Sequence, residues 1–228
     1  MKISAGQAPQ GVEGLEHSAF FATPVMEATL SGADQLCAAL REVISAKRAA
    51  DPGIGRSNIG GWHSDTEMTR WGGPAAQDLG RRTLELCLSH TSDSGTERGR
   101  PRYQMMMEMW ANVSPPGASN QLHAHPGSFW SAVFYVDDGG APEENQLILQ
   151  DPRFPTPQMA APSLVYVDGD RQPMVSQVAI TPAPGKLVCF PSWLLHSVRP
   201  NKGGQDRISI AMNILAVAGP PPQQQARW

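Results

Sequence analysis

The chain has 228 residues, of which 40% are hydrophobic and 17% charged, so its composition is that of a globular protein and excludes a disordered or collagen-like chain. The formal net charge of −3 lacks the positive footprint of a protein that binds phosphate backbones, which excludes nucleic acid as the main partner. Glycine and proline, at 22 and 21 residues, are abundant and favour many short strands joined by turns.

The N-terminal part of the chain is predicted to contain a strand followed by a helix. The segment AFFATPV, residues 19–25, has the composition of an opening strand. Ser31 then occupies the position of a helix N-cap, with Asp34 three residues further on as a weaker form of the capping box. Apolar side chains follow at helical spacing: Leu36, Leu40, Val43 and Ile44.

A glycine-rich segment, residues 51–65, follows this helix without any periodicity and is predicted to be a loop. Pro74 then opens a second helical pattern, since proline is favoured at the start of a helix. That pattern is carried by four positions: Leu79, Thr83, Leu86 and His90. We therefore expect residues 1–100 to be mostly helices and loops.

From Arg102 onward the hydrophobic period becomes two, as in a strand covered on both faces. The methionines of this strand are interpreted as core packing rather than as a cofactor site. Further strand-like runs follow at short intervals: residues 129–136, 146–150, 163–167, 174–180, 185–190 and 207–217. A sandwich or barrel over residues 101–218 is the predicted arrangement, followed by a loose polar tail at 219–228.

No apolar run approaches the roughly eighteen residues that span a bilayer, and the first residues contain no apolar signal core. A cytoplasmic protein without a membrane partner is therefore expected. Its three cysteines, Cys37, Cys87 and Cys189, are odd in number and far apart, which fits reduced core thiols better than disulfides or a zinc cluster. The sequence leaves the oligomeric state open.

Three histidines form a candidate metal site. His123 and His125, in NQLHAHPGSFW, are two residues apart, and on extended backbone both imidazoles point to the same side. His196 begins an extended stretch after the turn at Pro191, and a distant histidine can close a facial metal site. An ordinary structural role is the alternative for each histidine taken alone.

Strand alternation after His196 places Arg207, Ser209 and Asn213 on one face, with apolar side chains on the other. A solvent-exposed polar face is the alternative. We favour an interior pocket that binds a carboxylate, because a guanidinium is a planar bidentate donor and a neighbouring hydroxyl adds a further donor.

Together these motifs resemble those of one family. The HxH pair before a strand, then GKLVxFPSWxxHSV and finally RISIxxN, are similar to the small 2-oxoglutarate/Fe(II)-dependent oxygenases. The resemblance implies a mainly β fold, a double-stranded β-helix of the jelly-roll or cupin-like type, buttressed by N-terminal helices. It also implies one oxygenase domain over residues 1–228, with Fe(II), 2-oxoglutarate and dioxygen as cofactor and cosubstrates.

Carried over position by position, the resemblance places His123, His125 and His196 at the metal ligands. It places Arg207, with Ser209 beside it, at the distal carboxylate of 2-oxoglutarate. The wider superfamily has a carboxylate at the position of His125, so an all-histidine site and a His125 that does not ligate are both open. The two aspartates at 137 and 138 follow the next strand and do not replace that carboxylate convincingly.

Weaker candidates lie on neighbouring elements. Asn112 and Tyr135 come from strands that should line the same barrel, and either could hydrogen-bond the cosubstrate, with an ordinary strand position as the alternative. Trp62 and His63 lie on a glycine-flanked loop that could cover the barrel mouth and contact a substrate. Packing is the preferred interpretation of Trp62.

The predicted function is a 2-oxoglutarate- and Fe(II)-dependent dioxygenase that hydroxylates an unactivated C–H bond, with release of succinate and carbon dioxide. The expected substrate is an amino acid, a peptide or another small molecule. One alternative is a cupin-type three-histidine dioxygenase without 2-oxoglutarate, which lacks the expected glutamate after HxH and leaves Arg207 unexplained. Another is a non-catalytic metal-binding barrel.

Overall fold

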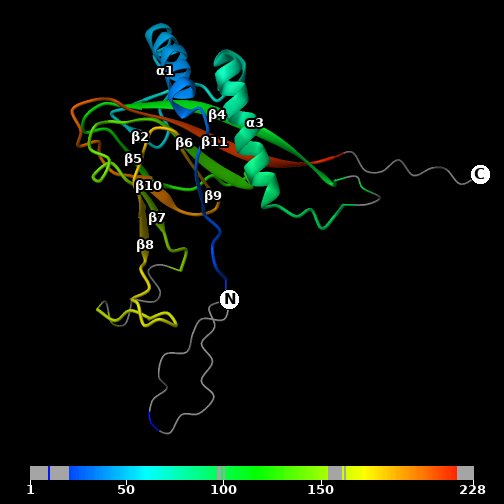
Figure 1. Cartoon of the computed structure of the whole chain (residues 1–228), viewed down its shortest axis with the longest axis vertical. Helices are drawn as coiled ribbons and strands as arrows, with labels where there is room; N and C mark the ends of the chain where they lie inside the picture. The colour runs from blue at the N-terminus through cyan, green and yellow to red at the C-terminus, as the bar shows by residue number, and fades with distance from the viewer. Residues whose placement is uncertain are drawn as a thin grey trace, which may run out of the picture.

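The computed structural model describes residues 10, 21–96, 99, 101–153, 161 and 163–219, and its main feature is a pair of antiparallel sheets (Figure 1). The larger sheet runs in the order β1 (Met26–Thr29), β9 (Lys186–Pro191), β6 (Trp130–Asp138), β11 (Arg207–Ala218), β4 (Tyr103–Ser114) and β3 (Trp62–His63). The smaller sheet runs in the order β2 (Asn58–Ile59), β5 (Ser119–His123), β10 (His196–Val198), β7 (Leu147–Gln150) and β8 (Gln177–Ile180). The predicted fold class is confirmed.

Two long helices, α1 (Ala33–Ala50) and α3 (Gly73–Ser89), cover the outer face of the larger sheet, with the single turn α2 (Met68–Trp71) between them (Figure 1). The predicted spacing of α1 is confirmed, because Leu36, Leu40 and Ile44 are buried in the core that this sheet shares with the helices. In α3 the buried side chains are Ala76, Leu79, Thr83 and Cys87, whereas His90 follows the helix and is exposed. Each fully buried leucine or isoleucine stabilises the fold by about 1.5–3 kcal/mol.

The N-terminal predictions need two corrections. The opening strand is not at 19–25: residues 19 and 20 lie outside the described residues, and β1 starts only at Met26, pairing with β9. Pro24 has no backbone N–H and cannot contribute to a ladder. Ser31 is not the N-cap of α1 either, since that position is taken by Gly32 in the left-handed conformation, with φ 69° and no side-chain cap. Glycine adopts this conformation without strain.

The segment 51–65 is not simply a loop. It contains β2, which pairs with β5 of the smaller sheet, and β3, which pairs with β4 of the larger one. Lys47 of α1 holds both ends of the segment, with Nζ 2.9 Å from Asp51 and 2.8 Å from Asp65. The first hundred residues therefore add strands to both sheets as well as helices.

The later strands follow the prediction with four exceptions. Burial on both faces of β4 begins only at Met109, and Met106 on the earlier part is 60% exposed. Residues 163–167 do not form a strand and make one bridge, between Val167 and Pro173. The predicted strand 174–180 shortens to β8, and β5 is a strand that the sequence interpretation missed.

Several remaining features bear on the sequence predictions. All three cysteines are buried and unpaired. None of the helices in the described ranges combines the length and apolar character of a membrane span. The tail after Gly219 lies outside the described residues.

A candidate metal centre and cosubstrate pocket

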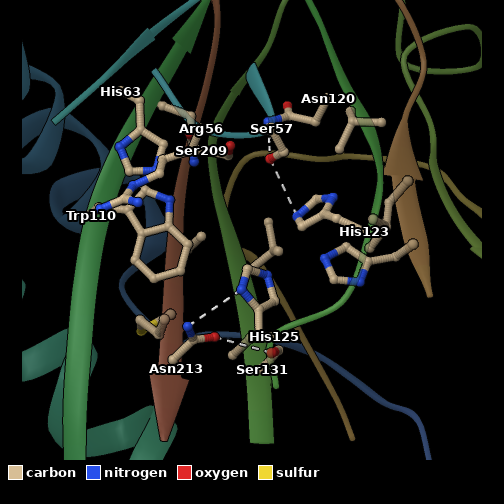
Figure 2. Close-up of a pocket in the computed structure, with 18 of the residues that line it drawn as sticks. Arg56, Ser57, His63, Trp110, Asn120, His123, His125, Ser131, Ser209 and Asn213 are labelled. Atoms are coloured by element: carbon tan, nitrogen blue, oxygen red, sulfur yellow. Dashed lines mark hydrogen bonds between the residues drawn. The ribbon is translucent and has the colours of Figure 1, made fainter. Parts of the chain in front are cut away.

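A cavity of about 460 Å³ lies between the two sheets and is lined by side chains from both (Figure 2). The larger sheet contributes the inward-facing residues of β4, β6 and β11, and the smaller sheet contributes residues of β5, β7 and β10. All seven residues predicted to bind the metal or the cosubstrate line this cavity: Asn112, His123, His125, Tyr135, His196, Arg207 and Ser209.

The three candidate histidines meet in this cavity. One ring nitrogen from each of His123, His125 and His196 lies within 4.8 Å of the others, as a shared metal requires. His123 ends β5 and His196 begins β10, and the two are partners in the antiparallel register. His125 lies two residues beyond the end of β5, outside the strand ladders. Its position is fixed instead by its backbone N–H, which donates to Ser192 O at 2.9 Å.

The imidazoles are oriented by hydrogen bonds at Nδ1. His123 Nδ1 lies 2.6 Å from Gln121 O and His196 Nδ1 lies 2.9 Å from Leu194 O. A carbonyl can only accept, so these Nδ1 atoms carry hydrogen and both Nε2 atoms keep a lone pair. Ligating histidines are held in this manner, with the second nitrogen bound to an acceptor.

His125 Nδ1 has a side-chain partner instead, the Asn213 amide at 3.4 Å (Figure 2). It is Asn213 Nδ2 that faces His125 Nδ1 in the structure, while Asn213 Oδ1 accepts from Ser131 Oγ–H at 3.1 Å. Because an amide can face either way, Asn213 can present its oxygen to His125 Nδ1–H and its nitrogen to Ser131. In that orientation Asn213 does for His125 what a backbone carbonyl does for each of the other two histidines.

Burial keeps the three rings neutral and able to ligate. It lowers the pKa of His196 to about 3 and that of His125 to about 4, in each case helped by the charge of His123. The pKa of His123 is lowered for the same reason, burial. Neutral imidazole is the form that binds metals, and it suits iron among other transition metals.

No carboxylate joins this group among the described residues. The metal-capable cluster consists of the three histidines, while Asp137 pairs with Arg41 at 3.1 Å. Three neutral ligands leave the full charge of a divalent metal uncompensated, which favours an anionic cosubstrate.

Arg207 supplies the anion-binding feature of the pocket. Its side chain is 2% exposed and lines the cavity, and its Nη1 donates to Arg199 O at 3.0 Å and Asn145 O at 3.3 Å. Its Nη2 is buried with no hydrogen-bond partner, and Arg207 forms no salt bridge with a described residue. A buried donor without a partner costs about 1–3 kcal/mol. The residues present therefore fit a bound carboxylate.

Three further polar side chains surround this arginine in the sheet register. Ser209 of β11 is paired with Tyr135 of β6 on one side and with Asn112 of β4 on the other. Burial raises the pKa of Tyr135, so its phenol is a neutral donor at physiological pH. Asn112 is 9% exposed, and its Oδ1 has no partner.

The structure adds lining residues that the sequence interpretation missed or left aside. Glu108 and Trp110 share the inward face of β4 with Asn112, so strand alternation was the signal that could have found them. His63, paired with Asn112, is buried in the cavity wall, whereas Trp62 packs on the core and donates to Asp51 O at 2.9 Å. Arg56 reaches the cavity only through the pairing of β2, which no local pattern predicts.

Comparison with known proteins agrees with the family that the sequence motifs resemble. Residues 108–213 match the sequence profile of the family described as "Putative 2OG-Fe(II) oxygenase". A search of curated proteins finds no match to the sequence.

Solved structures share the fold at low sequence identity. A Pseudomonas putida prolyl-4-hydroxylase is 19% identical, covering 85% of this chain and 92% of its own, with a TM-score of 0.53. The carbocyclase SnoK from nogalamycin biosynthesis is 12% identical, covering 89% and 85%, with a TM-score of 0.58. HygX from Streptomyces hygroscopicus, with nickel and 2-oxoglutarate bound, is 11% identical, covering 84% and 82%, with a TM-score of 0.57.

The two antiparallel sheets have the fold of these solved structures, and their cavity brings three histidines close enough to share one metal. The family match over residues 108–213 spans the three histidines, Arg207 and Ser209, and it agrees with the resemblance of the sequence motifs. The expected Fe(II), 2-oxoglutarate and dioxygen are confirmed at the level of this family and by the three-histidine group.

Proposed function

We propose that this protein is a 2-oxoglutarate- and Fe(II)-dependent hydroxylase. In this proposal His123, His125 and His196 hold the iron, and Arg207 holds the distal carboxylate of 2-oxoglutarate. The observation that carries it is the buried, unpartnered Nη2 of Arg207 in the same cavity as the three histidines. A dianion that chelates the metal and reaches this arginine would satisfy both features.

When bound, ferrous iron and 2-oxoglutarate activate dioxygen and supply the oxidation of a C–H bond, giving succinate and carbon dioxide. The work of the protein is positioning. Arg207 binds the carboxylate, and the hydroxyls of Tyr135 and Ser209 donate to its oxygens. Asn112 Nδ2 is a further donor on the same side. The apolar side chains of Phe190 and Leu147 line the cavity and exclude water from the reacting centre.

The proposed substrate is an amino acid, a peptide or another small molecule. Two structural neighbours support this range: a prolyl hydroxylase from Trichoplax adhaerens in complex with a peptide fragment, and HygX with hygromycin B bound. We further propose a cytoplasmic location, since three unpaired buried cysteines suit a reducing compartment.

The test is cosubstrate binding and turnover by the purified protein. Fe(II)-loaded protein is titrated with 2-oxoglutarate anaerobically by calorimetry, and then exposed to oxygen with ascorbate while succinate is measured. We expect saturable binding and slow succinate formation that a primary substrate accelerates. Iron-loaded protein that neither binds nor consumes 2-oxoglutarate would contradict the proposal.

One observation favours a second candidate, a three-histidine dioxygenase of the cupin type that does not use 2-oxoglutarate. The metal-capable group contains three histidines and no carboxylate among the described residues. In that case 2-oxoglutarate would not bind, and dioxygen would be consumed without succinate. The same titration separates the two candidates.

A further inference from the structure

The polar groups of the cavity separate into donors and acceptors by position. Around Arg207 the unpaired groups are donors: its own Nη2 and the hydroxyls of Tyr135 and Ser209. The wall formed by β3 and β4 instead presents acceptors at three of its four residues, while the fourth, Trp110, presents an aromatic ring. This β3–β4 wall consists of His63, Glu108, Trp110 and Asn112, and Figure 2 shows His63 and Trp110 across the cavity from His123.

Two acceptors of the wall are buried. His63 is 5% exposed, and its Nδ1 lies 2.6 Å from Ser64 O, so Nδ1 carries the hydrogen and Nε2 keeps a lone pair. No partner of His63 Nε2 occurs among the described residues. Asn112, its partner in the register, has an Oδ1 that is buried without a hydrogen bond. Asn112 Oδ1 is therefore a buried acceptor that lacks a donor, and His63 Nε2 is a second acceptor beside it in the wall.

Glu108 and Trp110 complete the wall. The Glu108 carboxylate lines the cavity and takes part in no ion pair with a described residue. The Trp110 ring stacks on His63 with 5.4 Å between centroids and 13° between planes, and lies 5.7 Å from the His125 ring. An aromatic face beside a carboxylate suits a cation. The wall also lies next to the candidate metal, where a substrate must be placed.

The cosubstrate cannot satisfy these acceptors. As a dianion, 2-oxoglutarate has only accepting oxygens, so it matches the donors around Arg207 and leaves the β3–β4 wall unmatched. Asn112 can serve both ligands, because an amide has a donor and an acceptor end. The groups that must satisfy the wall therefore belong to the primary substrate.

Arg56 supplies the opposite charge. It is exposed, it lines the same cavity beside β2, and its guanidinium forms no salt bridge with Glu108 or with any other described carboxylate. A cation and an anion thus line one cavity without neutralising each other. A ligand that carries both charges would pair with each.

We propose, resting on the proposed function, that the primary substrate is an amino acid or a similar zwitterion. Its terminal ammonium or guanidinium group is received by Glu108 beside the Trp110 ring, its carboxylate is received by Arg56, and a hydrogen-bond donor next to that carboxylate meets Asn112 Oδ1. This arrangement places the carbon chain of the substrate along the β3–β4 wall, where the Trp110 ring lies 5.7 Å from the His125 ring.

The test measures binding to protein loaded with Ni(II) and 2-oxoglutarate, which cannot turn over. The probes are L-lysine, cadaverine, 6-aminohexanoate and hexanoate, titrated by calorimetry or ligand-observed NMR. Cadaverine is lysine without its carboxylate, and hexanoate is 6-aminohexanoate without its amine. We expect each added charge to strengthen binding about three- to tenfold, as for partly exposed ion pairs.

Two variants assign each preference to a residue. Glu108→Gln should remove the advantage of 6-aminohexanoate over hexanoate, and Arg56→Gln should remove that of lysine over cadaverine. Glu67→Gln and Arg70→Gln are the matched controls, since those exposed residues pair with each other at 2.8 Å and do not line the cavity. Both controls should keep the wild-type preferences.

The proposal is overturned if hexanoate binds as well as 6-aminohexanoate, if no amine-bearing probe binds, or if Glu108→Gln leaves the preference unchanged. The affinity for 2-oxoglutarate, titrated first in every preparation, should stay the same in all variants. A wild-type protein that fails to bind 2-oxoglutarate contradicts the proposed function, whereas one that binds it and rejects amines contradicts only this inference.

Discussion

The two ends of the cavity are built from different kinds of element. At the inner end Arg207 and Tyr135 are each 2% exposed and lie on β11 and β6, which have long continuous ladders. At the other end Arg56 and Glu108 are exposed, and Arg56 depends on the two-residue strand β2. The residues proposed to bind the invariant cosubstrate are thus buried and fixed by strand register. Of those proposed to meet the substrate, Glu108 shares the β4–β11 ladder but is exposed, and Arg56 precedes an edge strand of the smaller sheet.

The largest effect is expected at the metal, from His196→Ala. A histidine-to-alanine change removes one of the three proposed ligands, so iron binding near stoichiometry should be lost. Metal content after dialysis measures this, and circular dichroism of the metal-free protein controls for folding. His123→Ala should also lose iron. Undiminished iron content in either variant would contradict the assignment of that histidine as a metal ligand.

The next effect is expected at the inner end, from Arg207→Lys. This change keeps the charge and loses the bidentate fork, so 2-oxoglutarate binding should weaken by about 1.5–3 kcal/mol, or at least tenfold. Iron affinity should change little. Calorimetry and a thermal melt on one preparation separate the roles, because an arginine that only ties strands together would lower Tm without lowering the affinity of the folded protein.

Asn213→Leu tests whether His125 is a ligand. If Asn213 Oδ1 orients His125 by accepting from Nδ1–H, loss of the amide should weaken metal binding about tenfold. That is the lower end of the effect of removing a hydrogen-bond partner of a metal ligand. The separation of 3.4 Å argues for that lower end. Ser131→Ala, which leaves the amide in place, should have a smaller effect. Equal metal affinity in Asn213→Leu and wild type would indicate that His125 does not ligate.

The smallest effect is expected from Lys47→Met at the ends of the segment 51–65. Hydrogen bonding to Lys47 lowers the pKa of Asp51. For Asp65 burial is the largest single influence and raises the pKa, but the hydrogen bonds from Lys47, the Glu67 N–H and Trp71 together lower it. Carboxyls with a lowered folded pKa stabilise the fold above about pH 3.8, their ordinary value, and lose this contribution as pH falls through the folded pKa. Wild-type Tm should therefore fall more steeply in acid than that of Lys47→Met. Parallel Tm profiles would show that Lys47 does not secure this segment.

Three strands of the larger sheet that carry the site, β4, β6 and β11, could be predicted because their signal is local, whereas β5, which ends at His123, was missed. On β11 every second residue faces the cavity, so Arg207, Ser209 and Asn213 were placed together from spacing alone. The opposite face, with Ile208 and Ile210, packs on the helices. The helical spacing of α1 was equally visible in the sequence.

Elements without such a period were predicted less well. Residues 163–167 are apolar and strand-like in composition, yet no neighbouring strand pairs with them beyond one bridge, and Leu164 is 70% exposed. The strand expected at 19–25 begins only after Pro24. A strand needs a partner as well as a composition, and partners are distant in the sequence.

The sequence by itself determined which residue types serve the chemistry and which strand faces they share, because side-chain alternation depends only on neighbouring residues. Only the tertiary structure decided what meets in the cavity. The convergence of His125 depends on a backbone hydrogen bond to Ser192, and His63 and Arg56 reach the cavity through pairings of β3 with β4 and β2 with β5. Such contacts join segments about sixty residues apart, and closing those loops is favourable only once both sheets have formed.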